Sequence, residues 1–155
     1  MTEVERIVDQ LDRAITAEAW HGPALLEILE DVRFEQASAR PISGGHSIWE
    51  LTLHISAWLD AGRRRLAGER AQLTDAEDWP AVPAITNEAW ANTKAAIRKH
   101  HQELRSAIAT LSDSHLEQPI IPGMSSTYVT LHGVIQHTLY HAGQIAILKK
   151  ALAEE

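Results

Sequence analysis

Two histidines, His137 and His141, lie four residues apart in a long C-terminal stretch whose apolar residues recur at helical spacing. Residues four apart on a helix have Cβ atoms about 5–6 Å apart, so both imidazoles can reach one metal ion. Thr138 stands where zinc proteases carry a glutamate, which excludes that class. The spacing alone leaves two interpretations open, a metal-binding pair and ordinary core or surface histidines.

His54 is the best candidate for a third ligand, because it lies in the middle of the apolar stretch Leu51–Trp58, where an unpaired polar ring would be costly. One imidazole from one helix and two from another would leave coordination positions open, as catalytic metal sites do. Gln144, one helical turn beyond His141, is a candidate for orienting a ligand. His46 is a candidate for contacting substrate. The alternative for Gln144 is solvation on the helix surface. The alternative for His46 is a role in capping the helix or in packing the loop.

The other five histidines are expected to lie on the surface and to carry no chemistry. Four occur in polar or terminal contexts, and the fifth falls opposite the apolar stripe of its own helix: His21, His100, His101, His115 and His132. Two tryptophans near His54, Trp49 and Trp58, are expected in the core or at a dimer interface.

Four long amphipathic segments must position these side chains, over residues 2–19, 48–67, 86–111 and 128–152. Capping boxes predict the starts of the first two, at Thr2 with Glu5 and at Ser47 with Glu50. A short helix over residues 24–32 is expected after the first. The remaining connections, 33–46, 69–84 and 112–127, are predicted to be loops. In the acidic segment 69–84, Asp75, Glu77 and Asp78 are expected to be solvated. The segment 112–127 is expected to contain a brief extended piece at 120–121.

The 155 residues are expected to form a single all-α domain, a four-helix bundle in which the long 69–84 connection is a crossover. A net charge of −7 argues against a nucleic-acid partner. No run approaches the roughly 20 apolar residues of a membrane span, and the acidic residues 2–5 do not have the form of a signal peptide. A cytoplasmic protein is therefore expected. The absence of cysteine leaves histidine and carboxylate as the metal ligands.

Two stretches together, Gly44–Trp58 and His137–Ile145, resemble the DinB-like superfamily of metal-dependent enzymes, and the resemblance extends over essentially the whole chain. It implies an up-down-down-up four-helix bundle that is commonly a homodimer. It also implies a divalent metal ion held by His54, His137 and His141. No role carries over to His132, where relatives often have a different residue.

The resemblance implies less about the reaction. Some relatives are transferases or isomerases that use a low-molecular-weight thiol, whose pKa a metal would lower. Water activation at the metal, a hydrolase-like reaction on a small molecule, is also open. Three imidazoles suit zinc, nickel, iron or copper, with zinc or nickel favoured and iron a further candidate. The alternative hypothesis is a stress-linked interaction protein that is not an enzyme and whose histidines are structural.

Overall fold

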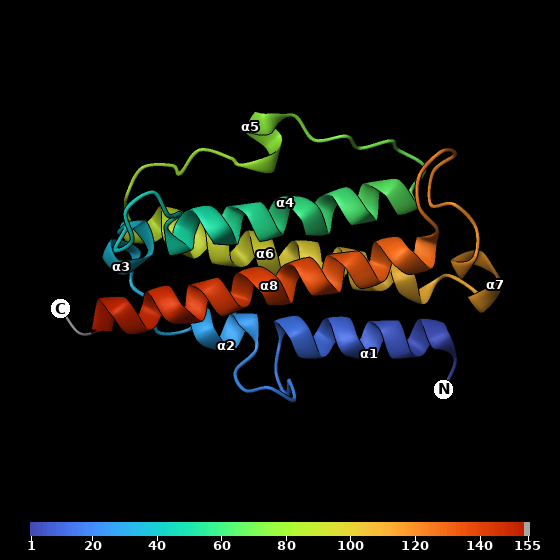
Figure 1. Ribbon diagram of the computed structural model, residues 1–155, viewed down its shortest axis with the longest axis horizontal. Coiled ribbons are helices and arrows are strands. Elements are labelled where there is room, and N and C mark those ends of the chain that lie inside the picture. The colour runs from blue at the N-terminus through green and yellow to red at the C-terminus, as the bar shows by residue number, and fades with distance from the viewer. Residues whose placement is uncertain (154–155) are drawn as a thin grey trace.

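The computed structural model describes residues 1–153, and within that range it is built from helices without a regular strand. The four long helices are α1 (Glu3–Ile15), α4 (Ile48–Leu66), α6 (Asn87–Ala109) and α8 (Thr127–Ala153). They lie side by side along the long axis of the molecule (Figure 1). Helices α1 and α4 each pack against both α6 and α8, so all four enclose one apolar core. No helix in the described residues is both long and apolar enough to cross a membrane.

The predicted helix starts are confirmed by their caps. At α1 the Thr2 hydroxyl accepts from the backbone N–H of Glu5, while the Glu5 carboxylate accepts from the N–H of Thr2. Ser47 and Glu50 make the same reciprocal pair at α4, which fixes where the helix carrying His54 begins. The helix ends just before Gly68, whose φ of +91° suits glycine.

Short helices occupy parts of the connections. They are α2 (Leu25–Leu29), α3 (Phe34–Ser38), α5 (Asp75–Asp78) and α7 (Asp113–Leu116). The prediction for 24–32 was thus too long, and the loop predicted at 33–46 contains a helix. Five residues are too few to show helical periodicity, although Gln36 caps the Arg33 N–H and Ala37 is buried. In the last connection the only bridge within the described residues joins Pro119 and Ser126, not the predicted 120–121.

Two buried tryptophans tie α4 to α6. Trp49 and Trp90 are almost fully buried, and their ring centroids are 5.1 Å apart. Each indole N–H has an acceptor, Thr93 Oγ1 at 2.9 Å for Trp49 and the Val32 carbonyl at 2.7 Å for Trp90. The prediction of a core position is therefore confirmed for Trp49, whereas Trp58 is only half-buried.

The surface prediction was wrong for His101 and inaccurate for His100. His101 is 5% exposed, and its Nε2 lies 2.9 Å from Asp12 Oδ1 of α1. His100 is half-buried, with Nδ1 2.8 Å from the hydroxyl of Ser56 on α4. Both histidines lie in a charged stretch of α6, which packs against both α1 and α4. One side of this stretch, with His101, faces α1, and another side, with His100, faces α4.

The connection between α4 and α6, residues 67–86, runs along the outer side of α4 and carries α5 partway along it (Figure 1). We call this connection the crossover segment. It passes close to α4 at α5 and continues to the start of α6. Its position matters for function, because Asp78 and Trp79, at the end of α5, contact His54 on α4.

Candidate metal centre

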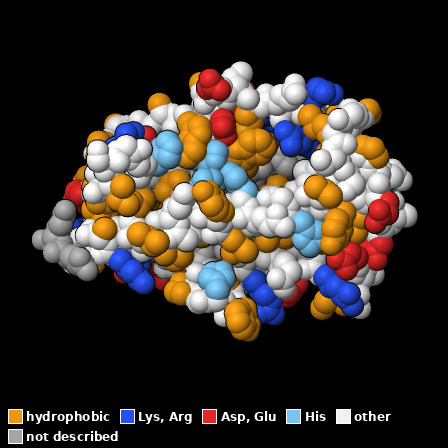
Figure 2. All heavy atoms as spheres, viewed as in Figure 1, with side chains coloured by type: hydrophobic (Ala, Val, Ile, Leu, Met, Phe, Trp, Pro, Cys, Tyr) orange, Lys and Arg blue, Asp and Glu red, His pale blue; other side chains and the backbone are white. Residues whose placement is uncertain are grey.

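His54 on α4 and His137 and His141 on α8 meet between the two helices. One imidazole nitrogen of each lies within 4.8 Å of the others. The Nε2 atoms of His54 and His137 are 2.9 Å apart. Two nitrogens bound to one ion at about 2.0–2.1 Å are themselves roughly 3 Å apart, so this spacing fits a shared ion. Histidine side chains gather near the middle of one face of the molecule (Figure 2).

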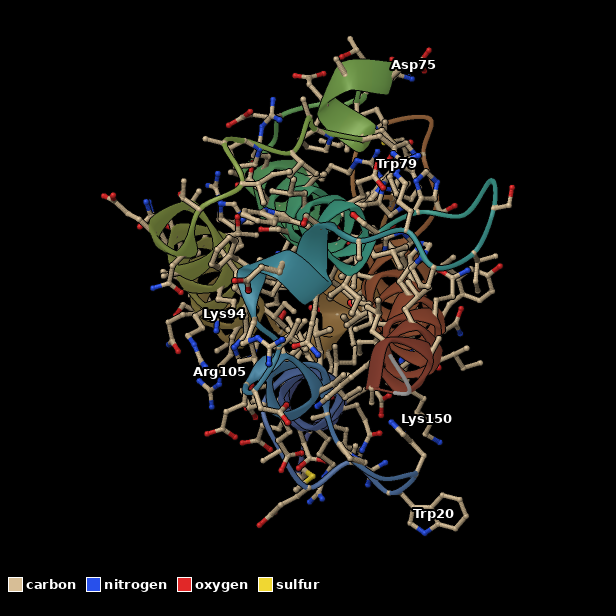
Figure 3. All side chains as sticks on the ribbon, turned by 90° about the vertical axis from the view of Figure 1, so that its left-hand side faces the viewer. Trp20, Asp75, Trp79, Lys94, Arg105 and Lys150 are labelled. Carbon is tan, nitrogen blue, oxygen red and sulfur yellow. The ribbon has the colours of Figure 1, made fainter. Side chains whose placement is uncertain are left out.

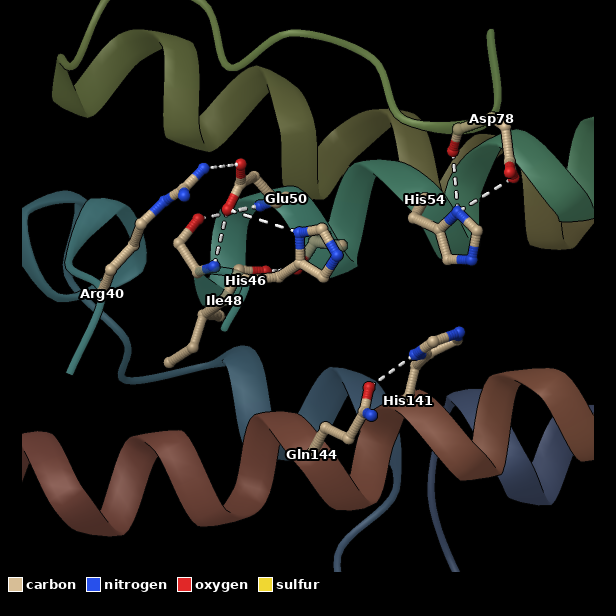
Figure 4. Close-up of polar contacts among 10 residues, drawn as sticks. Arg40, His46, Ile48, Glu50, His54, Asp78, His141 and Gln144 are labelled. Atoms are coloured by element: carbon tan, nitrogen blue, oxygen red, sulfur yellow. Dashed lines mark hydrogen bonds and ion pairs between the residues drawn. The ribbon is translucent and has the colours of Figure 1, made fainter. Parts of the chain in front are cut away.

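The tautomer of His54 is set by the crossover segment. Its Nδ1 lies 2.7 Å from the backbone carbonyl of Asp78 and 3.1 Å from Asp78 Oδ1 (Figure 4). A carbonyl oxygen can only accept, so Nδ1 carries the proton and Nε2 of the neutral ring carries the lone pair. Asp78 Oδ1 also accepts from the indole N–H of Trp58 at 2.6 Å, which holds the carboxylate in place. Such outer hydrogen bonds orient metal-binding histidines.

Gln144 sets the tautomer of His141 in the same way. Its Oε1 lies 2.6 Å from His141 Nδ1 (Figure 4), which leaves the lone pair on Nε2. Gln144 therefore contacts a neighbouring ligand candidate, and its orienting role stays a prediction. His54 and His141 are both buried, at 5% and 8% exposure, so neither ring depends on water for its orientation.

His137 is the half-buried member of the group, and its environment favours the neutral ring. Burial, together with the nearby rings of His141 and His54, lowers the pKa of His137 to about 4. Burial also lowers the pKa of His141, although the hydrogen bond that its ring donates to Gln144 acts in the opposite direction. Metal-binding imidazoles must be neutral, so these shifts favour coordination at neutral pH. The Nδ1 of His137 is buried and has no hydrogen-bond partner within residues 1–153.

Trp79 covers the histidines from the crossover segment. Its ring stacks on His54 at a centroid distance of 3.8 Å and on His46 at the same distance. His46 is exposed and is separated from His54 by the indole, so it lies at the edge of the group and not within it. Trp79 lies on the inner side of α5, whereas Asp75 points outward (Figure 3). The Trp79 indole therefore covers one side of the candidate metal centre.

Sequence reasoning missed Asp78 and Trp79. Asp78 was expected to be solvated with its acidic neighbours, but its side chain is only 32% exposed and contacts both His54 and Trp58. A tryptophan directly after an acidic stretch was the available signal, because a large aromatic ring in a polar connection usually packs against something.

Two other features near histidines do not join the centre. His132 was expected on the surface, yet it is half-buried beside Tyr128 at a ring distance of 4.3 Å. A second cluster of possible ligands comprises Asp60, His100 and Glu103. Arg63 pairs with Asp60 at 2.8 Å and lies 3.7 Å from Glu103, so these carboxylates already have a cationic partner.

Comparison with known protein families adds one finding. The sequence profile of the DinB superfamily matches residues 7–145, which include all three clustered histidines. The chain belongs to the DinB superfamily. Searches of the curated proteins and of the solved structures gave no match. DinB-like proteins are known as metal-binding, and the cluster of His54, His137 and His141 agrees with that property.

Proposed function

We propose that this DinB-like protein is a metal-dependent enzyme in which His54, His137 and His141 hold a divalent ion. The observation that carries the proposal is the geometry of the lone pairs. Asp78 accepts a hydrogen bond from Nδ1 of His54, and Gln144 accepts one from Nδ1 of His141. The Nε2 atoms of His54 and His137 lie 2.9 Å apart. With Nδ1 protonated on both rings, the Nε2 atoms of His54 and His141 each keep a lone pair that an ion can accept.

The proposed reaction acts on a small molecule, by transfer of a low-molecular-weight thiol or by hydrolysis. A bound divalent ion would lower the pKa of a coordinated thiol or water and so supply a nucleophile near neutral pH. The three imidazoles leave coordination positions for that ligand. Asp78 keeps the ring of His54 oriented, Gln144 that of His141, and Trp79 excludes water from one side. Zinc or nickel is the proposed metal, with iron a further candidate for this ligand set.

Metal analysis of untagged protein tests the proposal. We expect about one divalent ion per chain in the wild type, and its loss in His54→Ala and in the double variant His137→Ala/His141→Ala. His21→Ala is the control, because His21 is exposed and lies in the loop before α2. A chelator should lower the melting temperature of the wild type but not of the double variant. Full metal content in the double variant, or a melting curve insensitive to chelator, would favour the non-enzymatic alternative.

Two further proposals concern the arrangement of the chain. We propose the up-down-down-up bundle, which is supported by a crossover segment that runs along the length of α4. We also propose a homodimer, supported by exposed apolar side chains on α8, among them Tyr140 at 68% and Ile147 at 63% exposure. The molar mass in solution, measured by light scattering, tests the dimer. A cytoplasmic location stays a prediction from the sequence.

A further inference from the structure

A pocket of about 310 Å³ opens beside His137, between the end of α4 and the start of α8. Trp58 and Arg65 of α4 line one side, and Val129, Gly133 and His137 of α8 line the other. A hollow is visible beside the histidine side chains in Figure 2. Because His137 lines the pocket and also belongs to the cluster of three histidines, the pocket adjoins the candidate metal centre. Its volume is large enough for a small organic molecule.

Among the described residues that line this pocket, Arg65 is the only charged one. Its neighbours are paired, Arg63 with Asp60 and Arg64 with Glu69 at 2.8 Å each. No carboxylate within residues 1–153 forms an ion pair with Arg65.

The guanidinium of Arg65 is held in position but is not saturated. One Nη donates to the Ala71 carbonyl at 3.1 Å, and the group lies 5.4 Å from the ring centroid of Trp58. Its Nε is buried and has no hydrogen-bond partner in the described part of the chain. Burial without a counter-charge lowers the pKa of Arg65. Within residues 1–153 the guanidinium makes one hydrogen bond and no ion pair, so its remaining Nη donors can pair with an anion in the pocket.

The other walls fit a ligand with one charged end. His137, whose Nδ1 is likewise buried without a partner in residues 1–153, lines the pocket, as does the hydroxyl-bearing Ser125. Val129 and Val134 provide apolar walls. A Cβ built at Gly133 would meet no atom within 4 Å, so the helix surface there is open.

We propose that this pocket binds the carboxylate of a small organic acid through Arg65, with the rest of the molecule directed toward the metal centre. The proposal rests on the proposed function and names the substrate class of that site. A carboxylate matches the planar fork of a guanidinium, which can donate two parallel hydrogen bonds to it. One arginine in a pocket of this size suits a single carboxylate better than a multiply charged phosphate ester.

Calorimetric titration of the metal-loaded protein with propanoate tests this inference. We expect wild type to bind propanoate, and Arg65→Met to bind it about tenfold more weakly or worse, since charge-assisted hydrogen bonds are lost. Gly133→Leu should also abolish binding, because its side chain would fill the pocket without removing a charge. Arg64→Gln is the matched control, one residue away and paired elsewhere, and should bind as wild type does.

Two further probes define the class. Propanamide, the neutral isostere, should bind wild type at least about tenfold more weakly than propanoate. The proposal would be overturned if wild type bound propanamide as tightly as propanoate, or if Arg65→Met bound propanoate as tightly as wild type. It would also be overturned if wild type bound inorganic phosphate more tightly than propanoate. All variants should keep the metal content and circular dichroism of wild type. If wild type holds no metal, the proposed function fails, whereas Arg65-dependent binding of propanoate by that protein would still support the anion pocket.

Discussion

At the scale of single residues, the candidate centre depends on groups that do not themselves bind the ion. Asp78 and Gln144 fix which nitrogen of His54 and His141 is free, and thereby convert three nearby imidazoles into a possible ligand set. Asp78 contacts His54 through both its carbonyl and its carboxylate and also accepts from Trp58, whereas Gln144 contacts His141 through Oε1.

Replacing Asp78 with alanine should therefore weaken metal binding. The backbone carbonyl still accepts from His54, so we expect a loss of about 10–100-fold in affinity and not its abolition. Competition with a chromophoric chelator measures the change. Asp75→Ala is the control, because Asp75 lies in the same short helix with an exposed side chain. Equal affinities for wild type and Asp78→Ala would show that the carboxylate does not support the site.

At the scale of elements, two side chains that hold the crossover segment to the bundle also touch the histidines. Trp79 lies between His46 and His54, and Asp78 bonds to His54 and Trp58. The order of this segment and the geometry of the centre are consequently coupled, although the segment contains only one short helix of its own.

Trp79→Ala should loosen the crossover segment. Each aromatic pair contributes about 0.5–1.5 kcal/mol, so losing both stacking partners should raise the rate of tryptic cleavage after Arg70 roughly tenfold. Timed proteolysis with mass spectrometry of the fragments measures that rate. Trp20→Ala is the matched control, because Trp20 is fully exposed and projects away from the bundle (Figure 3). An unchanged rate in Trp79→Ala would mean that other contacts hold the segment.

At the scale of the whole molecule, stability depends on contacts between helices distant in sequence. His101 of α6 lies against Asp12 of α1, and Arg105 pairs with the same carboxylate at 2.9 Å. Burial lowers the pKa of His101 from 6.5, and this effect exceeds the opposing attraction of Asp12. The folded protein therefore binds fewer protons at His101 than the unfolded chain does at mildly acidic pH.

This difference gives stability a definite pH dependence. The contribution of His101 is fully present above the unfolded pKa of about 6.5 and is lost as the pH falls from there toward the lower folded value. With chelator present, the free energy of unfolding should decrease between pH 7 and pH 5, and less so in His101→Gln. Urea titrations at both pH values measure this, with His21→Gln as the control. A steeper decrease in His101→Gln would instead indicate a charged His101 paired with Asp12.

Most of the helical framework could be predicted from the sequence because its signals are local. Capping boxes at Thr2 and Ser47 and long apolar stripes set the boundaries of α1 and α4 to within a few residues. The short helices α3, α5 and α7 were missed, since four or five residues show no period. His101 was misjudged because the polarity of neighbours in sequence does not report which helix packs above a given side chain.

For the candidate centre, the sequence by itself determined the ligand types and their places on two helices: His54 in an apolar stretch, and His137 with His141 one turn apart. Only the tertiary structure decided that their nitrogens converge, that Asp78 and Trp79 reach them from the crossover segment, and that Arg65 faces an open pocket without a counter-charge. The physical reason is the separation in sequence over which each interaction acts. Helix period, capping and the contact of Gln144 with His141 act over three or four residues, whereas the contacts of His54 with Asp78 and with His137 join groups 24 and 83 positions apart.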